Sequence, residues 1–324
     1  MYKFLQPTLV GAMLLLLTLS ARSQVYVTND TGPFTVSSFS AAGTLNNSAL
    51  LSSTNVSLGL NSPVGIAVSG STLYVANYAA GTVGEYSTSG TLINATLVSG
   101  LYHPWGIALS GSTLYVADNG TGTVSAYTLS GSTATADASF TAISGQPNLM
   151  GVAVSGSNLY ISNYANSVLN TAYTGSISAF NAVTGAALNG GTPVVTGLDG
   201  PSSLAANGST LYASMVFGKS VGAFTISGTT LTSPNATFIT TADAAYGVAV
   251  GLSGLYVLTQ NQYGGGAIGL YNPTTGAGTI VATSGLYTPF GIAAVVPEPA
   301  AWSAIAGGLV LVGVVLRRKY SRPS

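Results

Sequence analysis

The fold is decided by a stretch that reads GIAVSGSTLYVAN (residues 65–77). It holds two short apolar segments with the alternation of strands, joined by a turn rich in serine and glycine. The phrase returns along the chain, with its tyrosine at Tyr74, Tyr115, Tyr160, Tyr212 and Tyr256. Self-similarity at a fixed period predicts a repeat architecture in which each repeat is one supersecondary unit.

Each tyrosine segment is followed by a third short segment with period-two alternation, as in residues 82–86 and 123–127. A fourth segment then leads to a Gly-Leu pair shortly before a proline, such as Pro104 or Pro201. Four strands in a repeat of about 45 residues are typical of a β-propeller blade.

The two ends of the repeat region predict the number of blades. Residues 26–29 and 35–39 read as the second and third strands of a unit that has no first strand before it, and residues 290–293 read as a first strand with no partners after it. Joined, they make one composite blade, so five whole units and one split unit give six. Closure of the ring would remove the exposed sheet edges that invite aggregation.

Composition supports an all-β chain. The sequence contains 42 glycines and 18 tyrosines, is rich in serine, threonine and valine, and has only 4% charged residues. Such a composition suits strands joined by tight turns and suits helices badly. With no cysteine, stability must come from packing and sheet hydrogen bonds rather than from disulfides.

The repeated phrases resemble the NHL and YVTN families of β-propellers over about 270 residues. Residues 26–29 read YVTN, whereas residues 74–77 (YVAN) and 115–118 (YVAD) match the middle strand of NHL repeats. NHL units usually carry an aspartate after Gly-Ile-Ala-Val, and this chain has serine there instead. The resemblance therefore implies a six-bladed fold and does not carry over a binding habit.

Residues 1–23 are predicted to be a secretory signal peptide. Lys3 gives a basic start, residues 9–19 form an apolar run, and residues 21–23 place small residues at a cleavage site. The apolar run is too short to favour the alternative of an uncleaved membrane anchor. We expect signal peptidase to cut before Gln24.

Residues 296–324 have the layout of a surface-sorting tail. A Val-Pro-Glu-Pro segment is followed by an uncharged apolar run (residues 300–316) and then by a basic cluster. This order resembles the PEP-CTERM signal, which implies processing by a membrane-embedded exosortase. The apolar run predicts a transmembrane helix with its basic end in the cytoplasm, and an ordinary C-terminal anchor is the alternative. The residues assigned to sorting are Val296, Pro297, Glu298, Pro299, Arg317, Arg318 and Lys319.

The propeller region, residues 24–295, is weakly acidic. Lys219 is its only lysine or arginine, against five aspartates and one glutamate. A region without a basic patch cannot neutralise phosphates, so nucleic acid is excluded as an expected partner.

An enzyme with a metal in the central channel is the alternative to a binding module, because some lactonases and lyases with a similar ring hold calcium or zinc there. His103 is the only histidine, so a multi-histidine zinc site is excluded by count, and beside Pro104 it is expected to be a loop residue. Calcium would need oxygen ligands from the ends of the second strands, where turn formation is the simpler role. Those candidates are Asn29, Asp30, Asn77, Asp118, Asn119 and Asn163. We expect no catalytic residue, metal or cofactor.

One face of the predicted disc concentrates aromatic residues. In a propeller the loop that leads into the first strand and the loop between the second and third strands open on the same side. The lead-in positions hold Val64, Trp105, Met150, Tyr246 and Phe290. The candidate binding face consists of Trp105, Tyr246, Phe290, Tyr78, Tyr164, Phe217 and Tyr263. Aromatic rings near amides suit carbohydrate or peptide ligands, and the alternative is that the lead-in residues plug the channel.

A stretched loop, residues 163–175, is expected to add to this face, because inserted loops often carry function. The sequence thus predicts an exported, exosortase-sorted surface or matrix protein. Its propeller is expected to act as a non-enzymatic module for glycan or protein contact in an exopolysaccharide or biofilm setting. A scaffold for other envelope proteins is a further alternative.

Overall fold

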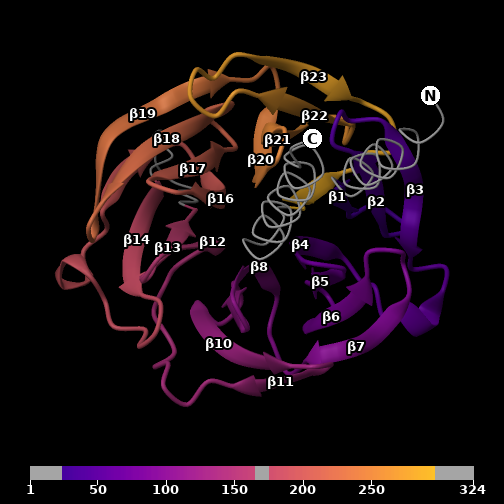
Figure 1. Ribbon diagram of the computed structural model, residues 1–324, viewed down its shortest axis with the longest axis horizontal. Helices are drawn as coiled ribbons and strands as arrows, with labels where there is room; N and C mark the ends of the chain where they lie inside the picture. The colour runs from indigo at the N-terminus through magenta and orange to yellow at the C-terminus, as the bar shows by residue number, and fades with distance from the viewer. Residues whose placement is uncertain (1–23, 165–174, 296–324) are drawn as a thin grey trace, which may run out of the picture.

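The computed structural model describes residues 24–164 and 175–295. These residues form six four-stranded antiparallel sheets arranged in a ring. Figure 1 shows the first strands around the centre and the fourth strands at the rim. The described part of the chain is a six-bladed β-propeller, as the sequence predicts.

The strands are numbered along the chain, and their bounds follow blade by blade. Blade 1 contains β24 (Pro289–Ala294), β1 (Gln24–Asn29), β2 (Thr35–Ser40) and β3 (Leu45–Ser52). Blade 2 contains β4 (Pro63–Ser69), β5 (Thr72–Asn77), β6 (Thr82–Ser87) and β7 (Leu92–Val98). Blade 3 contains β8 (Pro104–Ser110), β9 (Thr113–Asp118), β10 (Thr123–Ser130) and β11 (Thr133–Ala136).

The remaining blades follow the same order. Blade 4 contains β12 (Leu149–Ser155), β13 (Asn158–Asn163), β14 (Gly175–Asn181) and β15 (Val195–Leu198). Blade 5 contains β16 (Pro201–Asn207), β17 (Thr210–Met215), β18 (Ser220–Ser227) and β19 (Thr230–Thr240). Blade 6 contains β20 (Ala244–Gly251), β21 (Gly254–Gln260), β22 (Gly266–Tyr271) and β23 (Gly278–Ala282). Two short 3-10 helices, η1 (Val56–Leu58) and η2 (Asn189–Gly191), lie in connections.

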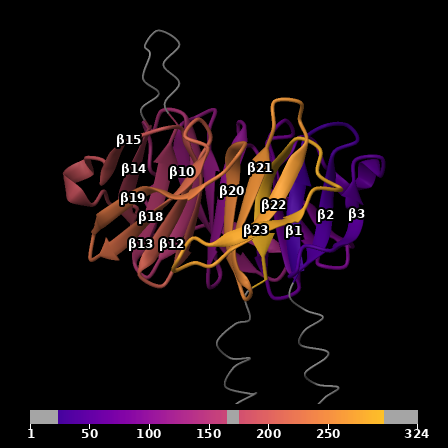
Figure 2. The same ribbon diagram turned by 90° about the horizontal axis from the view of Figure 1, so that it is seen from above.

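Blade 1 closes the ring from both ends of the described chain. Strand β24 pairs antiparallel with β1, with Val27 opposite Ile292, and the Val295 amide donates to the Gln24 carbonyl at 3.0 Å. The predicted closure is therefore confirmed. Gln24 begins β1, and Ala294 ends the antiparallel strand β24. Both ends of the described chain therefore lie on the face of the disc opposite the lead-in loops; Figure 2 shows the disc from the side.

Glycine recurs in the phrase because neighbouring first strands approach each other closely. Each first strand has a register shift across its lead-in residue, for example between Pro104 and Ile107, on either side of Trp105. A Cβ atom on Gly106 would lie 2.3 Å from the Met150 carbonyl oxygen of blade 4. The matching distances are 2.0 Å at Gly65 and 2.2 Å at Gly151. Only glycine admits such an approach without a shift of backbone.

Four of the repeated tyrosines join neighbouring blades through their hydroxyl groups. The Tyr115 hydroxyl donates to the Ala182 carbonyl in the turn between the third and fourth strands of blade 4, at 2.7 Å. Tyr212 and Tyr256 make the same contact with the turns of the blades that follow them, and Tyr26 does so at 3.4 Å. A buried tyrosine needs a partner for its hydroxyl, so this contact explains why the motif has tyrosine rather than phenylalanine.

A second set of interblade contacts lies near the channel. The Ser162 hydroxyl accepts from the Gly151 amide at 2.7 Å and donates to the Ser202 carbonyl of blade 5 at 2.6 Å. Thr28 bridges blades 1 and 2 in the same way, through its contacts with Gly291 and Val64. The same position is Ala76 in blade 2 and Ala117 in blade 3, so these blades have no hydroxyl there.

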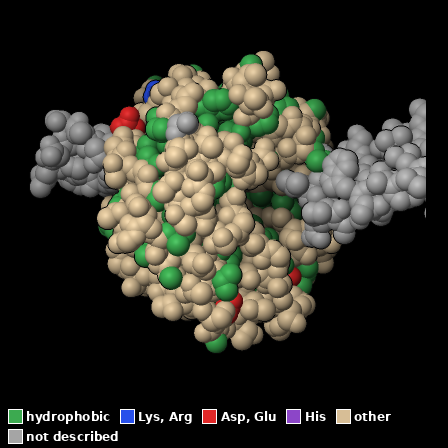
Figure 3. Space-filling view, turned by 60° about the vertical axis from the view of Figure 1, so that its left-hand side comes forward, with side chains coloured by type: hydrophobic (Ala, Val, Ile, Leu, Met, Phe, Trp, Pro, Cys, Tyr) green, Lys and Arg blue, Asp and Glu red, His purple; other side chains and the backbone are tan. Residues whose placement is uncertain are grey.

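The surface has few charges. In the view of Figure 3 most of the described surface is backbone and uncharged polar side chains, with apolar side chains between them. The apolar core lies between neighbouring blades, where residues of adjacent sheets pack in shared clusters. No helix in residues 24–164 or 175–295 is long and apolar enough to cross a membrane. The predicted signal peptide and sorting tail lie outside the described residues.

Candidate functional site

The central channel is built in tiers, because the first strand of each blade contributes equivalent positions. The deepest of these tiers is apolar, with one buried aliphatic residue from each blade: Ile66, Ile107, Val152, Leu204, Val248 and Ile292. Above it lies the glycine tier, in which blade 5 has Ser203. The outermost tier is formed by the lead-in residues, to which blade 5 contributes Ser202.

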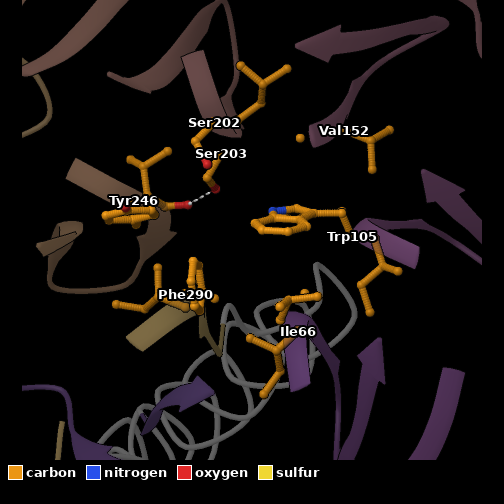
Figure 4. Close-up of a pocket in the computed structure, with 16 residues that line it drawn as sticks. Ile66, Trp105, Val152, Ser202, Ser203, Tyr246 and Phe290 are labelled. Atoms are coloured by element: carbon orange, nitrogen blue, oxygen red, sulfur yellow. Dashed lines mark hydrogen bonds between the residues drawn. The ribbon is translucent and has the colours of Figure 1, made fainter. Parts of the chain in front are cut away.

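Three lead-in aromatic rings border a cavity of about 80 Å³ at the mouth of this channel. Trp105 and Phe290 lie edge to face, with ring centroids 5.5 Å apart, and so do Tyr246 and Phe290 at 5.2 Å. Trp105 lies across the cavity from Tyr246 in Figure 4, with Phe290 on one flank and Ser203 on the other. One wall is thus aromatic and the other small and hydroxylated.

The aromatic group continues outward over blades 2 and 3. Tyr78 meets Trp105 edge to face at 5.5 Å and stacks on His103 at 4.2 Å with an interplanar angle of 8°. Tyr102 stacks on the other side of His103 at 4.2 Å and is 60% exposed. The imidazole is therefore sandwiched between two tyrosines, and the outer face of Tyr102 is free for contact with solvent.

Two further aromatic pairs lie on the same face. Tyr164 and Phe217 have ring centroids 5.3 Å apart, between blades 4 and 5. Tyr263 and Tyr287 lie in neighbouring loops, because Gly265 forms a bridge with Tyr287, and they are 87% and 63% exposed. The aromatic residues of the candidate binding face thus lie on one side of the disc, in three separate groups rather than a continuous rim. Their role in binding stays a prediction.

The aromatic lead-in residues also fill part of the channel mouth. Trp105, Tyr246 and Phe290 are only partly exposed and pack on one another above the apolar tier. Burial raises the pKa of Tyr246 above its ordinary value. Plugging and binding are compatible here, because the plug leaves the small cavity open between its rings.

The face is acidic. Among the described residues, Asp30, Asp118, Asp199 and Asp243 lie in or beside its loops, and Lys219 is the single lysine or arginine there. Burial raises the pKa of Asp30, and a hydrogen bond from Ser62 opposes the rise. Asp118 accepts from the Tyr102 amide at 2.8 Å, while its second carboxylate oxygen is buried without a hydrogen-bond partner.

The residues at the ends of second strands have a structural role, as predicted, but of a different kind. We expected them to bond their own turns, whereas the side chains of Asn29, Asn77, Asp118 and Asn163 fasten the lead-in loop of the same blade. Asn119 instead donates to the Leu149 carbonyl in the lead-in of the next blade. Asn77 accepts from the Asn61 amide at 3.4 Å, and the Asn163 amide donates to the Pro147 carbonyl at 3.0 Å. Asn29 accepts from the Tyr287 amide at 3.0 Å. These contacts hold the aromatic loops in place.

No group of three or more His, Cys, Asp or Glu side chains in the described ranges is placed to hold a metal ion. His103 lies in a lead-in loop, as predicted, with φ of 64°. The loop of residues 163–175 falls largely outside the described residues.

Comparison with known proteins establishes similarity of fold only. The search for protein-family profiles gave no match, and neither did the search of curated proteins. A chain in a crystal structure of a nidogen/laminin complex is similar with a TM-score of 0.61 and 13% identity, over 84% of this chain and 97% of that one.

Two bacterial structures are similar at comparable distance. A putative 6-phosphogluconolactonase from Bacteroides uniformis has a TM-score of 0.53 and 17% identity, over 80% of this chain and 81% of its own. A periplasmic gluconolactonase of Pseudomonas aeruginosa has a TM-score of 0.52 and 16% identity, over 80% and 82%. At such identities the similarity establishes the six-bladed propeller, and the NHL and YVTN resemblance stays a prediction.

Sequence reasoning missed three members of the site. His103 is expected from sequence to be a loop residue only, Tyr287 belongs to the pair before Pro289, and nothing in the sequence singles out Tyr102. The signal was present, since each lies in a lead-in loop. What the sequence did not reveal is that these loops fold back over the second-to-third loops and place the rings together.

Proposed function

We propose that this protein is an exported, cell-surface or matrix protein whose propeller is a non-enzymatic binding module for a glycan or a protein. One observation carries the proposal. Among the described residues, the exposed aromatic side chains are Tyr102, Phe217, Tyr263 and Tyr287, and all lie in loops of a single face.

Exposed aromatic residues that gather on one face of a protein with few charges favour a contact surface. Tyrosine buries a broad apolar ring while its hydroxyl still reaches a polar partner, which suits the mixed surface of a sugar or a peptide. The loops are also held firmly, because the second-strand amides described above fasten them. A preformed surface loses less conformational entropy on binding.

The location rests on the two ends of the sequence. Residues 1–23 would direct export and be removed by signal peptidase, and residues 296–324 would hold the protein in the inner membrane until an exosortase acts near Pro297 to Pro299. The arrangement of the ring supports this reading, because Gln24 and Val295 are neighbours and neither predicted cut interrupts a strand.

Intact mass of the protein released from cells tests the processing. We expect one species that begins at Gln24 and ends close to Pro299. A species that retains residues 1–23 or the basic cluster at Arg317 and Arg318 would contradict the sorting proposal, while it would leave the binding module untouched.

Binding is tested with the purified protein on arrays of immobilised glycans and of immobilised envelope proteins. We expect retention on one array and at least a tenfold loss for a Tyr263→Ser and Tyr287→Ser double variant. Val183→Ser is the matched control, because Val183 is 61% exposed in a different part of the surface. Equal retention of the double variant and the control would contradict the assignment of this face.

A further inference from the structure

A larger cavity lies between blades 5 and 6, on the side of the disc opposite the aromatic loops. It is bordered by Asn207 and Thr210, on either side of the first-to-second turn of blade 5, and by Pro273 and Thr274 in the third-to-fourth turn of blade 6. Its volume of about 320 Å³ is well above the roughly 150 Å³ of a cavity that takes up benzene and lies at the lower end of the range for small-molecule sites. The cavity is therefore large enough for one ring-sized ligand.

The cavity depends on a small side chain opposite the repeated tyrosine of blade 5. Ala223 pairs with Tyr212 across β17 and β18, is partly exposed and lines the cavity. Blade 6 has the much larger Leu270 at the equivalent position. In the first four blades the equivalent residue is at most 4% exposed: Ser38, Glu85, Ala126 and Ala179. Space that is covered or filled in those blades is thus open in blade 5.

One wall carries an asparagine whose counterpart in blade 2 joins two blades. Asn235 lies opposite Ala223, as Asn94 lies opposite Glu85, and each accepts from the amide two residues further on, at 3.3 and 3.0 Å. Asn94 also donates to the Ser132 carbonyl of the next blade at 3.0 Å. The hydrogen bonds among the described residues include none from the Asn235 amino group. The cavity lies where this interblade contact is missing, so a ligand can accept from that group.

The other walls combine uncharged polar groups with apolar surface. Hydroxyl groups that can both donate and accept belong to three lining residues, Thr210, Thr225 and Thr274. Apolar surface comes from the partly exposed Phe238, whose ring centroid lies 6.0 Å from that of the buried Tyr212. No side chain among the described residues of the lining is charged. An ionised ligand would therefore lose hydration here without gaining a counter-charge.

We propose that this cavity binds a neutral sugar residue. The hydroxyl groups of a sugar ring would exchange hydrogen bonds with the asparagine and threonine side chains, while its C–H surface would contact the aromatic and proline side chains. The site goes beyond the proposed function, because it lies on the opposite side of the disc from the aromatic loops and uses none of their residues.

Ligand-detected NMR with the purified protein tests the proposal, because saturation transfer from a protein to a small ligand reports weak binding. The probes are the methyl glycosides of glucose, galactose and mannose, each compared with the methyl glycoside of the corresponding uronic acid. We expect saturable transfer to at least one neutral glycoside and at least tenfold weaker binding of its uronic acid counterpart.

Variants taken from the other blades separate the cavity from the fold. Ala223→Leu introduces the side chain that blade 6 has at this position, so it should fill the cavity and weaken binding at least tenfold. Asn235→Asp keeps the acceptor for its turn, as Asp137 does in blade 3, but removes the donors and should also weaken binding. Ala136→Leu, on the exposed strand β11, is the matched control and should bind normally.

Unfolding curves establish that each variant is folded, and Asn235→Asp carries the comparison if Ala223→Leu is not. The proposal is overturned by an absence of saturable transfer to all three neutral glycosides, by uronic acids that bind as tightly, or by unchanged binding in both cavity variants. The Tyr263→Ser and Tyr287→Ser double variant should bind the glycoside like the unmodified protein. Its array retention is measured separately, so failure of this site and failure of the proposed function are distinguishable.

Discussion

Glu85 is a buried carboxylate in the described core. It lies on β6 with 4% of its surface exposed, and one carboxylate oxygen is buried without a hydrogen-bond partner. Burial raises the pKa of Glu85 above the ordinary value. Burial also raises the pKa of Tyr74, and the nearby Glu85 charge adds to that rise. A buried carboxylate without full hydrogen bonding destabilises the folded state when it is ionised.

The first prediction concerns the pH dependence of stability. Because the folded-state pKa of Glu85 is raised, the folded protein holds its proton more tightly than the unfolded chain does. Stability therefore falls as the pH rises from the ordinary glutamate pKa through the raised one. Glu85→Gln should remove this contribution and increase the free energy of unfolding at neutral pH by about 1–3 kcal/mol. Urea unfolding at several pH values measures it.

Asp137 is the control, because its pKa is shifted in the opposite direction to that of Glu85. It is partly exposed, and hydrogen bonds from Ser139 lower its pKa. Its contribution is present above the ordinary aspartate pKa and is lost as the pH falls, so Asp137→Asn should not stabilise the protein at neutral pH. A Glu85→Gln variant with unchanged stability at every pH would contradict the account of Glu85.

The interblade tyrosines give a second prediction at the scale of single residues. Tyr115→Phe removes the donor to the buried Ala182 carbonyl and should cost about 1–2 kcal/mol of unfolding free energy. Tyr102→Phe, whose ring is 60% exposed, is the matched control and should stay within about 0.5 kcal/mol. Thermal or denaturant unfolding compares them, and equal stabilities would show that the hydroxyl contact does not join the blades.

Among the elements, the first and second strands do most to position the site. Their pairing fixes three successive positions of the first strand. The lead-in residue lies at the channel mouth, the glycine lies beside the next blade, and the aliphatic residue lies in the channel. The hydroxyl near the end of the second strand then connects one blade to the next. The residue at this position varies. Some neighbouring blades are therefore joined by a hydroxyl group at this position, and others are not.

That variation yields a reciprocal pair of substitutions. Ser162→Ala leaves the Gly151 amide and the Ser202 carbonyl without their common partner and should cost about 1–3 kcal/mol. Ala117→Ser introduces a hydroxyl at the same position of blade 3, beside Gly106 and the Met150 carbonyl, and should be stabilising. Denaturant unfolding of both variants decides, and a loss of stability in both would mean that blade 3 is closed by packing alone.

The elements could be predicted from sequence where the signal lies within one repeat. The four strands and their turns follow from a phrase such as residues 65–77, whose alternation and glycines repeat at a fixed period. The contacts that hold the blades together could not be predicted from sequence, because the two residues of each contact lie in different repeats. Tyr115 and Ala182 are 67 positions apart, and Thr28 and Val64 are 36 apart. A motif shows that a tyrosine recurs without showing which carbonyl it meets.

The same distinction applies to the candidate site. Seven aromatic residues could be placed on one face from topology alone, because lead-in and second-to-third loops share a side. Their grouping depends on how the loops fold: His103 sits between Tyr78 and Tyr102 because the lead-in loop of blade 3 turns back with φ of 64°. Such backbone detail has no period in the sequence.

At the scale of the whole molecule, stability depends on closure in blade 1. A chain that ends before Pro289 lacks β24 and leaves β1 with an unpaired edge and an open interface to blade 6. We expect this truncated protein to lose its single cooperative transition and to aggregate, because exposed edges pair with other chains. Size-exclusion chromatography and thermal unfolding would show it.

A circular permutant is the matched control for that truncation. Gln24 and Val295 are close enough for a short linker, and new ends can be opened in the exposed turn at Ser89 and Gly90 of blade 2. The permutant keeps all strands and should unfold cooperatively as a monomer. A truncated chain that behaves like the permutant would show that the ring does not need its closing strand.

The neighbouring positions of Gln24 and Val295 also fix how the disc stands on any support. Whatever holds the chain by either terminus meets the side of the first-to-second turns, so the aromatic loops point away from it. Strand β1 has 6 residues, which makes the disc a rigid spacer about 20 Å high. A molecule held at either end would thus present its aromatic loops outward, at the far side of the disc.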